Sequence, residues 1–156
     1  MGVSGMELRP VDRLNFNDVL KLEVAPDQIE LVPPPSVSIA RAHIKPDGPD
    51  WHYQPLAIYR KDRLVGFLLL VTPKSKSGTA WLSGFLIDRR FQGHRLGRRS
   101  LQALHDLLRT EFPNITQLNL TVAANNRAAI ALYENTGFVF TGAVHDGELV
   151  RSVEFE

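Results

Sequence analysis

The sequence predicts one mixed α/β domain in which a single sheet is flanked by helices. Two observations lead to this fold class. A chain of 156 residues suits one domain with one core, and 44% hydrophobic with 22% charged residues is ordinary for a globular protein. Short apolar runs of strand length also alternate with amphipathic segments of helical length along the chain. We find no repeats and expect residues 1–156 to form a single domain.

The first quarter of the chain predicts a strand, a helix and an irregular segment. Residues 6–9 alternate apolar and polar side chains and are closed by a proline, which indicates a short strand. Apolar residues at helical spacing favour a modest helix over residues 11–22. Three consecutive prolines exclude one continuous helix over residues 25–42, so we expect helical turns on either side of them, the second capped by Ser36 or Ser38.

The middle of the chain predicts three strands. Apolar runs at residues 55–59 and 64–71 are separated by four charged residues and indicate a hairpin of two largely buried strands. A polar turn follows at residues 73–78. The next apolar run, residues 80–87, indicates a third strand, which leads towards the longest predicted helix.

The C-terminal half contains the clearest helix, residues 97–111. Leu101, Leu104 and Leu108 recur there at i, i+3 and i+7, while the charged residues lie elsewhere on the helix. The remaining predicted elements are a strand at 118–122, a short helix at 127–135, and strands at 138–144 and 149–155 joined in a hairpin by Asp146-Gly147. Hairpins together with a crossover predict a mixed sheet.

Composition excludes several classes of function. A net charge of +1 argues against a protein built to coat nucleic acid or an anionic membrane. The chain has no cysteine, which excludes disulfides, thiolate zinc sites and a cysteine nucleophile, and its five histidines show no metal-ligand spacing. It also lacks a signal-peptide pattern and any apolar run near the roughly 20 residues that span a bilayer. We therefore expect a cytoplasmic protein without a metal site.

The segment from Trp81 to Phe112 carries the clearest functional signal. An apolar strand leads through a glycine-containing loop directly into the amphipathic helix, and free N–H groups with the positive end of the dipole make such a helix start an anion site. Gly93 and Gly97 allow a close approach of the backbone. The spacing fits neither a P-loop nor the dinucleotide-binding glycine pattern.

Arginines surround this helix start. Cations there oppose the helix dipole at roughly 0.3–1 kcal/mol each when exposed, so their number suggests a bound polyanion. A solvated basic turn is an equally good interpretation of the charge alone. The five arginines concerned are Arg89, Arg90, Arg95, Arg98 and Arg99.

Two motifs resemble the GCN5-related N-acetyltransferase (GNAT) family. Gln92-Gly93-His94-Arg95-Leu96-Gly97 is similar to the six-residue family loop, which has Gln or Arg first, Gly fourth and Gly or Ala sixth. Gln92 and Gly97 match the first and last positions, and Arg95 replaces the usual middle glycine. Residues 126–138, NRAAIALYENTGF, match the family pattern N-x-x-A-x-x-L-Y-x-x-x-G-F at every fixed position. Residues 24–28, 52–55 and 64–67 also resemble the bacterial spermine/spermidine acetyltransferase-like branch.

The resemblance implies a GNAT fold, a mostly antiparallel sheet with one splayed parallel pair, Trp81–Ile87 and Leu118–Val122. It implies acetyl-CoA as co-substrate and direct transfer of the acetyl group to an amine. Tyr133 is then the acid that protonates the thiolate. A helical Arg95 adds a charge for a phosphate. The oxyanion of the reaction would lie near Leu86. The implied cofactor-binding residues are Phe85, Leu86 and Ile87 along the pantetheine arm of the cofactor, Asn126 against the same arm, and Gln92, Gly93, His94, Arg95, Leu96, Gly97 and Arg98 around its pyrophosphate.

The resemblance leaves the base and the acceptor open. Many relatives carry an acidic residue where this chain has Ser83-Gly84, and Ser83 has no partner to activate it as a nucleophile. A water chain or one of four residues, Glu23, Asp27, Glu30 or His145, is left as the base. The acceptor expected first is a small amine or a polyamine. An amino acid, an aminoglycoside-like drug and a protein amine are the alternatives.

Other interpretations are a non-catalytic CoA-binding sensor or interaction module and, less compatible with the balanced charge, a nucleic-acid-binding protein. Edge strands near the C-terminus are compatible with a homodimer. We expect neither nucleic acid nor a membrane as partner.

Overall fold

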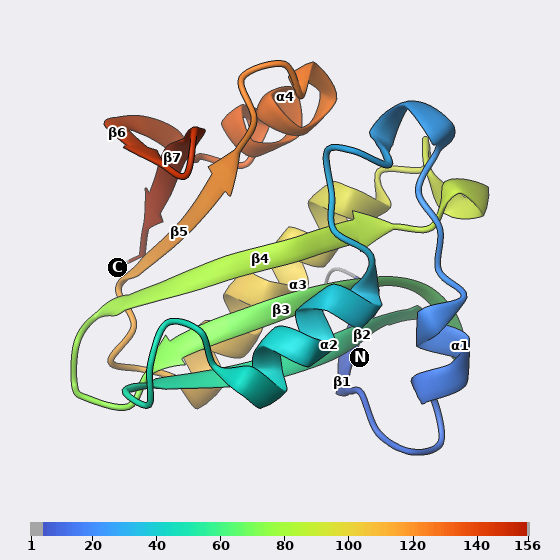
Figure 1. The fold of residues 1–156 in the computed structure, drawn as a ribbon, viewed down its shortest axis with the longest axis horizontal. Helices are drawn as coiled ribbons and strands as arrows, with labels where there is room; N and C mark the ends of the chain where they lie inside the picture. Colours follow the sequence, from blue (N-terminus) through green and yellow to red (C-terminus); the bar gives the residue numbers. More distant parts are fainter. Residues whose placement is uncertain (1–4, 156) are drawn as a thin grey trace.

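The structure, a computed structural model, describes residues 5–155, which form one seven-stranded sheet with helices on both faces (Figure 1). The strands are β1 (Met6–Pro10), β2 (Trp51–Arg60), β3 (Arg63–Pro73), β4 (Thr79–Ile87), β5 (Gln117–Val122), β6 (Val139–His145) and β7 (Glu148–Glu154). The helices are α1 (Phe16–Leu20), α2 (Pro35–Ile44), α3 (Leu96–Glu111) and α4 (Arg127–Asn135), with short 3₁₀ helices η1 (Pro26–Gln28) and η2 (Arg89–Phe91).

The sheet order is β1-β2-β3-β4-β5-β7-β6. Neighbouring strands are antiparallel except β4 and β5, which run parallel because α3 forms the crossover between them. The predicted fold class, a mixed and mostly antiparallel sheet with one parallel pair, is confirmed.

Strand β3 shows why the middle of the chain is so apolar. Leu68 and Leu70 belong to the core on one face of the sheet, whereas Phe67 and Leu69 belong to the core on the other. Successive side chains of a strand point to opposite faces, so a strand covered on both sides reads as a continuous apolar run. Each of these side chains contributes roughly 1.5–3 kcal/mol by its burial.

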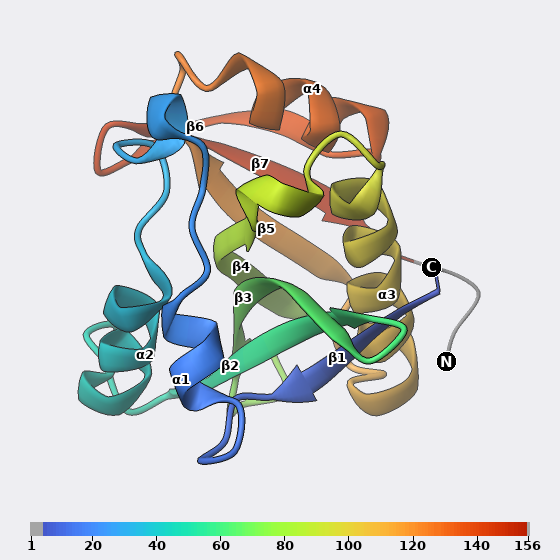
Figure 2. The same ribbon diagram turned by 90° about the vertical axis from the view of Figure 1, so that its right-hand side faces the viewer.

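The helices cover the sheet in two layers (Figure 2). Leu101, Leu104 and Leu108 of α3 pack in the same core as Tyr133 of α4. Val19 of α1 packs in the second core, on the face that α1 and α2 cover. The helices α3 and α4 therefore lie on one face of the sheet, and α1 and α2 on the other.

Two predictions in the N-terminal quarter are wrong. The helix expected over residues 11–22 is only the short α1, because Asp12 Oδ1 accepts hydrogen bonds from the N–H groups of Leu14 and Asn15 and holds a turn instead. Leu14, one of the apolar residues that suggested this helix, is 83% exposed. Neither proposed serine caps α2, which begins at Pro35; Ser38 is buried within the helix.

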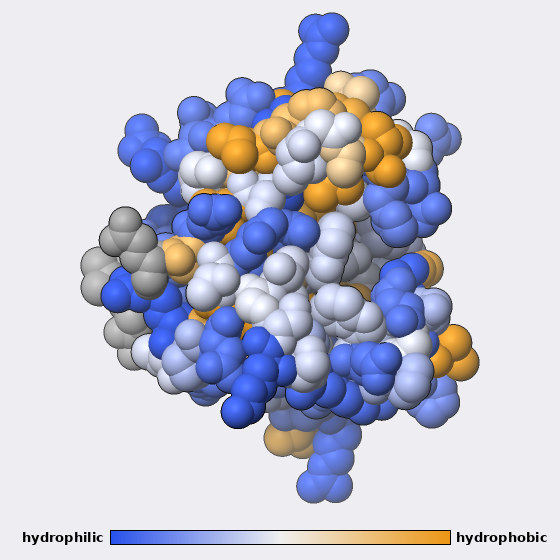
Figure 3. Space-filling view, turned by 90° about the vertical axis from the view of Figure 1, so that its left-hand side faces the viewer, coloured by the Kyte–Doolittle hydropathy of each residue, from blue (hydrophilic) through white to orange (hydrophobic). Residues whose placement is uncertain are grey.

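Strand β6 forms an edge of the sheet, and all seven of its residues are exposed. Its large apolar side chains are Val139, Phe140 and Val144. Figure 3, which views the molecule from the left-hand side of Figure 1, shows apolar side chains gathered at the top. An unpaired edge strand with apolar side chains is a surface for association. The homodimer stays a prediction, with β6 as the surface that it would use.

Within residues 5–155, no helix combines the length and the apolar character needed to cross a bilayer.

Candidate active site

Strands β4 and β5 separate halfway along their length, which opens the sheet (Figure 1). Their parallel pairing covers only Thr79–Leu82 of β4. Beyond it, the pairing of β4 with β3 shifts register next to Gly84, whose φ of 58° is left-handed. A bulge bends a strand and increases its twist, so the last residues of β4 turn away from β5. The edge of β4 that faces β5 is unpaired from there on.

A cavity of about 560 Å³ lies between this open edge, the start of α3 and α4. It brings together Tyr133 and every predicted cofactor-binding residue except His94, which is exposed in the same loop but does not line the cavity. The lining residues that sequence reasoning missed are Val24, Gln28, Val32, Phe91, Ala128, Ala129, Leu132 and Asn135. The first three come from the irregular N-terminal segment, which shows no local pattern that points to a ligand.

The loop before α3 leaves the start of the helix open. Arg95 is the N-cap residue, and no side chain of the described residues caps the helix there. The first N–H groups of α3 consequently remain available for an anion. Arg95 itself has φ 59° and ψ 21°, so the helical conformation expected for it is wrong: it adopts the left-handed conformation that glycine takes without strain.

Of the five arginines expected around the anion, two line the cavity: Arg95 and Arg98. Arg89 lies 3.4 Å from the Glu23 carboxylate and Arg90 lies 2.8 Å from Asp88. Arg99 does not line the cavity, and its guanidinium lies beside Gly5. Glu23 is distant from Arg89 in the chain, whereas Asp88 is two residues from Arg90, and together they reduce the free positive charge expected at this helix.

Replacing Arg95 separates its backbone strain from its charge. The left-handed conformation costs an L-residue about 1–2 kcal/mol, and glycine adopts it without this strain. Glycine also has more conformational freedom in the unfolded chain, which offsets part of the gain. The free energy of unfolding of Arg95→Gly should therefore exceed that of Arg95→Ala by about 1 kcal/mol. Both variants should bind CoA about tenfold more weakly, because both lose one charged contact. Chemical denaturation and calorimetric titration with CoA measure the two effects. An Arg95→Ala variant as stable as Arg95→Gly would contradict the strained loop.

Gln92 ties the loop to two other parts of the chain. Its Nε2 donates to the Ile87 carbonyl at the end of β4 and to Oε1 of Gln28, both at 2.9 Å. Gln28 Oε1 also accepts from the Ala25 N–H at 3.1 Å. Gln92 was expected only as a ligand contact, but here it also fixes the segment before α2 against the cavity.

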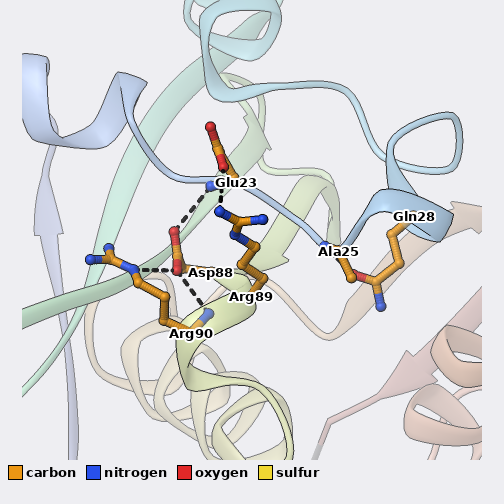
Figure 4. Close-up of polar contacts among 6 residues, drawn as sticks. All are labelled: Glu23, Ala25, Gln28, Asp88, Arg89 and Arg90. Atoms are coloured by element: carbon orange, nitrogen blue, oxygen red, sulfur yellow. Dashed lines mark hydrogen bonds and ion pairs between the residues drawn. The ribbon is translucent and has the colours of Figure 1, made fainter.

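The buried carboxylate of Asp88 fixes the same segment from the other side (Figure 4). Its Oδ2 accepts from the Glu23 N–H at 3.0 Å, and its Oδ1 accepts from the N–H and Nε of Arg90 at 3.0 and 2.8 Å. Burial by itself raises the pKa of Asp88, but these hydrogen bonds outweigh it and the net pKa lies below the ordinary value. Asp88 therefore anchors the segment at Glu23 to the end of β4.

Tyr133 stands where the cavity passes between the strands. Its ring is 8% exposed and packs edge-on against Phe138, with 5.5 Å between centroids. Burial raises the pKa of its hydroxyl and the nearby Glu148 carboxylate raises it further, so the group stays protonated at neutral pH. None of the described residues hydrogen-bonds to this hydroxyl, which leaves it free to donate to a ligand.

A second cavity of about 320 Å³ begins on the other side of Tyr133. Five residues line both cavities: Val32, Phe85, Asn126, Ala129 and Tyr133. Asn126 also caps α4, where its Oδ1 accepts from the Ala129 N–H at 3.3 Å. The second cavity further contains Arg41 of α2 and, around the β6–β7 turn, His145, Asp146 and Glu148. The two cavities thus meet at Tyr133: the first lies against the start of α3, and the second contains the carboxylates of Asp146 and Glu148.

The structure separates the four candidate bases. Only His145 lines the second cavity; its side chain is 65% exposed and lies 3.4 Å from Asp146. Glu23 pairs with Arg89 away from Tyr133, and Asp27 and Glu30 line neither cavity. Sequence reasoning missed Glu148, and its position directly after the turn Asp146-Gly147 was the available signal.

Within the described part of the chain, no three His, Cys, Asp or Glu side chains are grouped so that they hold a metal ion.

Comparison with known proteins identifies the family. The acetyltransferase (GNAT) family profile matches residues 19–138. The chain is 33% identical to the spermine/spermidine N(1)-acetyltransferase of Bacillus subtilis (strain 168), over 96% of this chain and 98% of that protein. Two solved structures share the fold: an aminoglycoside acetyltransferase with coenzyme A and kanamycin (TM-score 0.73, 17% identity, 96% and 94% of the two chains) and the Vibrio cholerae spermidine N-acetyltransferase with CoA and spermine (TM-score 0.70, 18%, 96% and 94%). The chain belongs to the acetyltransferase (GNAT) family.

Proposed function

We propose that this acetyl-CoA-dependent acyltransferase transfers the acetyl group directly to a primary amine of a small cationic molecule, a polyamine first. One observation carries the proposal: Tyr133 forms a wall of both cavities. A thioester held on one side and an amine held on the other meet at its hydroxyl. Direct transfer fits because the described residues offer no activated nucleophile in either cavity.

The first cavity has the features that acetyl-CoA needs. The open N–H groups of α3, together with Arg95 and Arg98, suit a pyrophosphate. The unpaired edge of β4 at Phe85 and Ile87 offers backbone groups for the amides of the pantetheine arm. Gly93, with φ 85° and no atom within 4 Å of an added Cβ, leaves the loop open towards the ligand. The bound molecule supplies an activated acetyl group as its thioester.

Tyr133 supplies the proton that the departing sulfur requires. A thiolate is a poorer leaving group than a thiol, so an acid beside the sulfur lowers the barrier by the amount typical of general acid catalysis, about 10²–10⁴-fold in rate. The raised pKa of Tyr133 keeps the phenol protonated at the pH at which the enzyme works. Its burial excludes water that would otherwise compete for the hydrogen bond.

The second cavity supports a cationic acceptor. Glu148 and Asp146 face a space that also holds His145, and carboxylates in a partly closed cavity attract an ammonium group. The full-length relative in Bacillus subtilis is described as acting on spermine and spermidine, which favours a polyamine over the aminoglycoside of a neighbour that shares the fold alone.

An amine panel tests the proposal. The purified chain is mixed with acetyl-CoA and spermidine, spermine, an aminoglycoside or single amino acids, and release of free CoA is followed with a thiol reagent; the chain's lack of cysteine removes background from the protein. We expect release with spermidine and spermine above the rate without an amine. Release with another amine and none with either polyamine would contradict the polyamine assignment and leave the acyltransfer intact. Tight CoA binding without release for any amine would favour the sensor interpretation.

A further inference from the structure

The acceptor amine has to lose a proton before it can react. An aliphatic amine with an ordinary pKa of about 10.4 is an ammonium ion at neutral pH, and its lone pair becomes available only when a base removes the proton. We propose that Glu148 is this base: its carboxylate takes the proton from the acceptor ammonium in the second cavity. The inference rests on the proposed function and adds to it the identity of one catalytic residue.

The geometry places Glu148 at the reacting end of the second cavity. It is half-buried at the start of β7, where β7 pairs with the end of β5, and it shares this cavity with Tyr133. The Thr121 hydroxyl donates to its Oε1 at 2.9 Å and so fixes the carboxylate. No described residue engages Oε2, which remains available to an ammonium group.

The absence of a cationic partner distinguishes Glu148 from the carboxylates around it. Asp146 lies 3.4 Å from His145, and its side chain is 92% exposed. Glu134, on the same helix as Tyr133, lies 3.2 Å from Arg151. Among the described residues, no Lys, Arg or His is paired with Glu148. A half-buried carboxylate without a counter-ion gains most when a cation enters its cavity.

The electrostatic contact with Tyr133 supports the same placement. Glu148 raises the pKa of the Tyr133 hydroxyl, which requires the two groups to be near enough for their charges to interact through the protein. A proton acceptor and a proton donor then lie on the two sides of the reacting carbon, as acyl transfer to an amine requires.

The step balances with these two residues. The ammonium ion gives one proton to Glu148, and the freed lone pair forms the C–N bond to the thioester carbon. The C–S bond breaks and its electron pair goes to sulfur, which takes the proton of the Tyr133 hydroxyl. The second proton of the nitrogen returns to the Tyr133 oxygen, and Glu148 gives its proton to water. The products are an amide, a free thiol and one proton.

Glu148→Gln tests the inference, with Glu154→Gln as the matched control on the same strand, because Glu154 is exposed and lines neither cavity. Both substitutions remove one negative charge with little change of shape. With the polyamine that the wild type acetylates, we expect Glu148→Gln to lower kcat/KM at neutral pH by about 10²-fold, whereas Glu154→Gln remains close to wild type. Unchanged CoA binding by calorimetry shows that the variants are folded.

A split between kcat and KM separates a base from a binding group: loss of a base lowers kcat at saturating amine, whereas loss of a carboxylate that only binds the amine raises KM. Two further readouts test whether Glu148 acts on the charged acceptor. The deficit of Glu148→Gln should shrink as the pH rises towards the pKa of the amine, because more acceptor then arrives uncharged. It should also be small for hydroxylamine, which is uncharged at neutral pH. A deficit that is constant with pH and equal for both acceptors would overturn the inference, as would an unaffected Glu148→Gln variant. In either case an active wild type leaves the proposed function standing, while a wild type that releases no CoA with any amine overturns both.

Discussion

Replacing Tyr133 by Phe should lower kcat for acetyl transfer by about 10³-fold, within the range of general acid catalysis. The hydroxyl is the one group of the residue that stands to meet the departing sulfur, and Phe lacks it. The binding of CoA should change little, because the cavity beside α3 keeps its arginines and its helix start. Steady-state kinetics with the best amine of the panel measure kcat, and calorimetric titration measures CoA affinity.

The fold should tolerate this substitution. The Tyr133 ring packs edge-on against Phe138, and Phe retains that contact. No described residue hydrogen-bonds to the hydroxyl, so its removal leaves no partner unsatisfied. Tyr59→Phe on β2, which lines neither cavity, is the matched control and should keep wild-type kcat. A Tyr133→Phe variant with wild-type kcat would rule out the acid role of this tyrosine.

The pH profile gives an independent check on Tyr133. An ordinary tyrosine would lose its proton near pH 10 and produce an alkaline decline in rate there. Burial and Glu148 raise the pKa of Tyr133, so the protonated form persists through that range and the decline should lie at higher pH. A decline well below pH 10 that is absent in Tyr133→Phe would contradict the burial of this hydroxyl.

The elements around the cofactor cavity could be predicted from local patterns in the sequence. The helix at residues 97–111 was recognised because Leu101, Leu104 and Leu108 lie on one helix and repeat at its period. The parallel pair followed from the family resemblance, and the two strands are β4 and β5 as expected. In each case the decisive residues are close together in the sequence, where periodicity and motif spacing are visible.

Contacts between distant residues were beyond the reach of these patterns. Glu148, Thr121 and Tyr133 come from β7, β5 and α4, and they meet only because the β6–β7 hairpin folds back onto the end of β5. The neutralisation of Arg89 by Glu23 likewise joins residues that are far apart in the chain. A count of charges therefore placed five arginines around the anion, whereas the pairing of Arg89 depends on the tertiary fold.

Replacing Asp88 by Ala should destabilise the fold by about 3 kcal/mol, because it removes charged hydrogen bonds and leaves the part-buried N–H groups of Glu23 and Arg90 without this partner. Asp88→Asn should cost less, since one oxygen still accepts. Asp18→Asn on the exposed face of α1 is the control and should change stability by less than about 0.5 kcal/mol. Urea denaturation measures all three variants. Wild-type stability of Asp88→Ala would contradict the anchoring role (Figure 4).

The depressed pKa of Asp88 also fixes the sign of a pH effect. The folded state favours the carboxylate, so its stabilising contribution is fully present above the unfolded pKa of about 3.9 and is lost as the pH falls through the lower folded pKa. The stability gap between wild type and Asp88→Asn should therefore narrow as the pH falls below about 4. Because Asp88 holds the segment at Glu23, and Gln28 on that segment lines the cofactor cavity, acid should weaken CoA binding in the wild type before it unfolds the sheet. CoA titrations carried from neutral pH to below pH 4 compare the two chains, and a wild type that retains its CoA affinity until global unfolding would show that the segment and the cavity are independent.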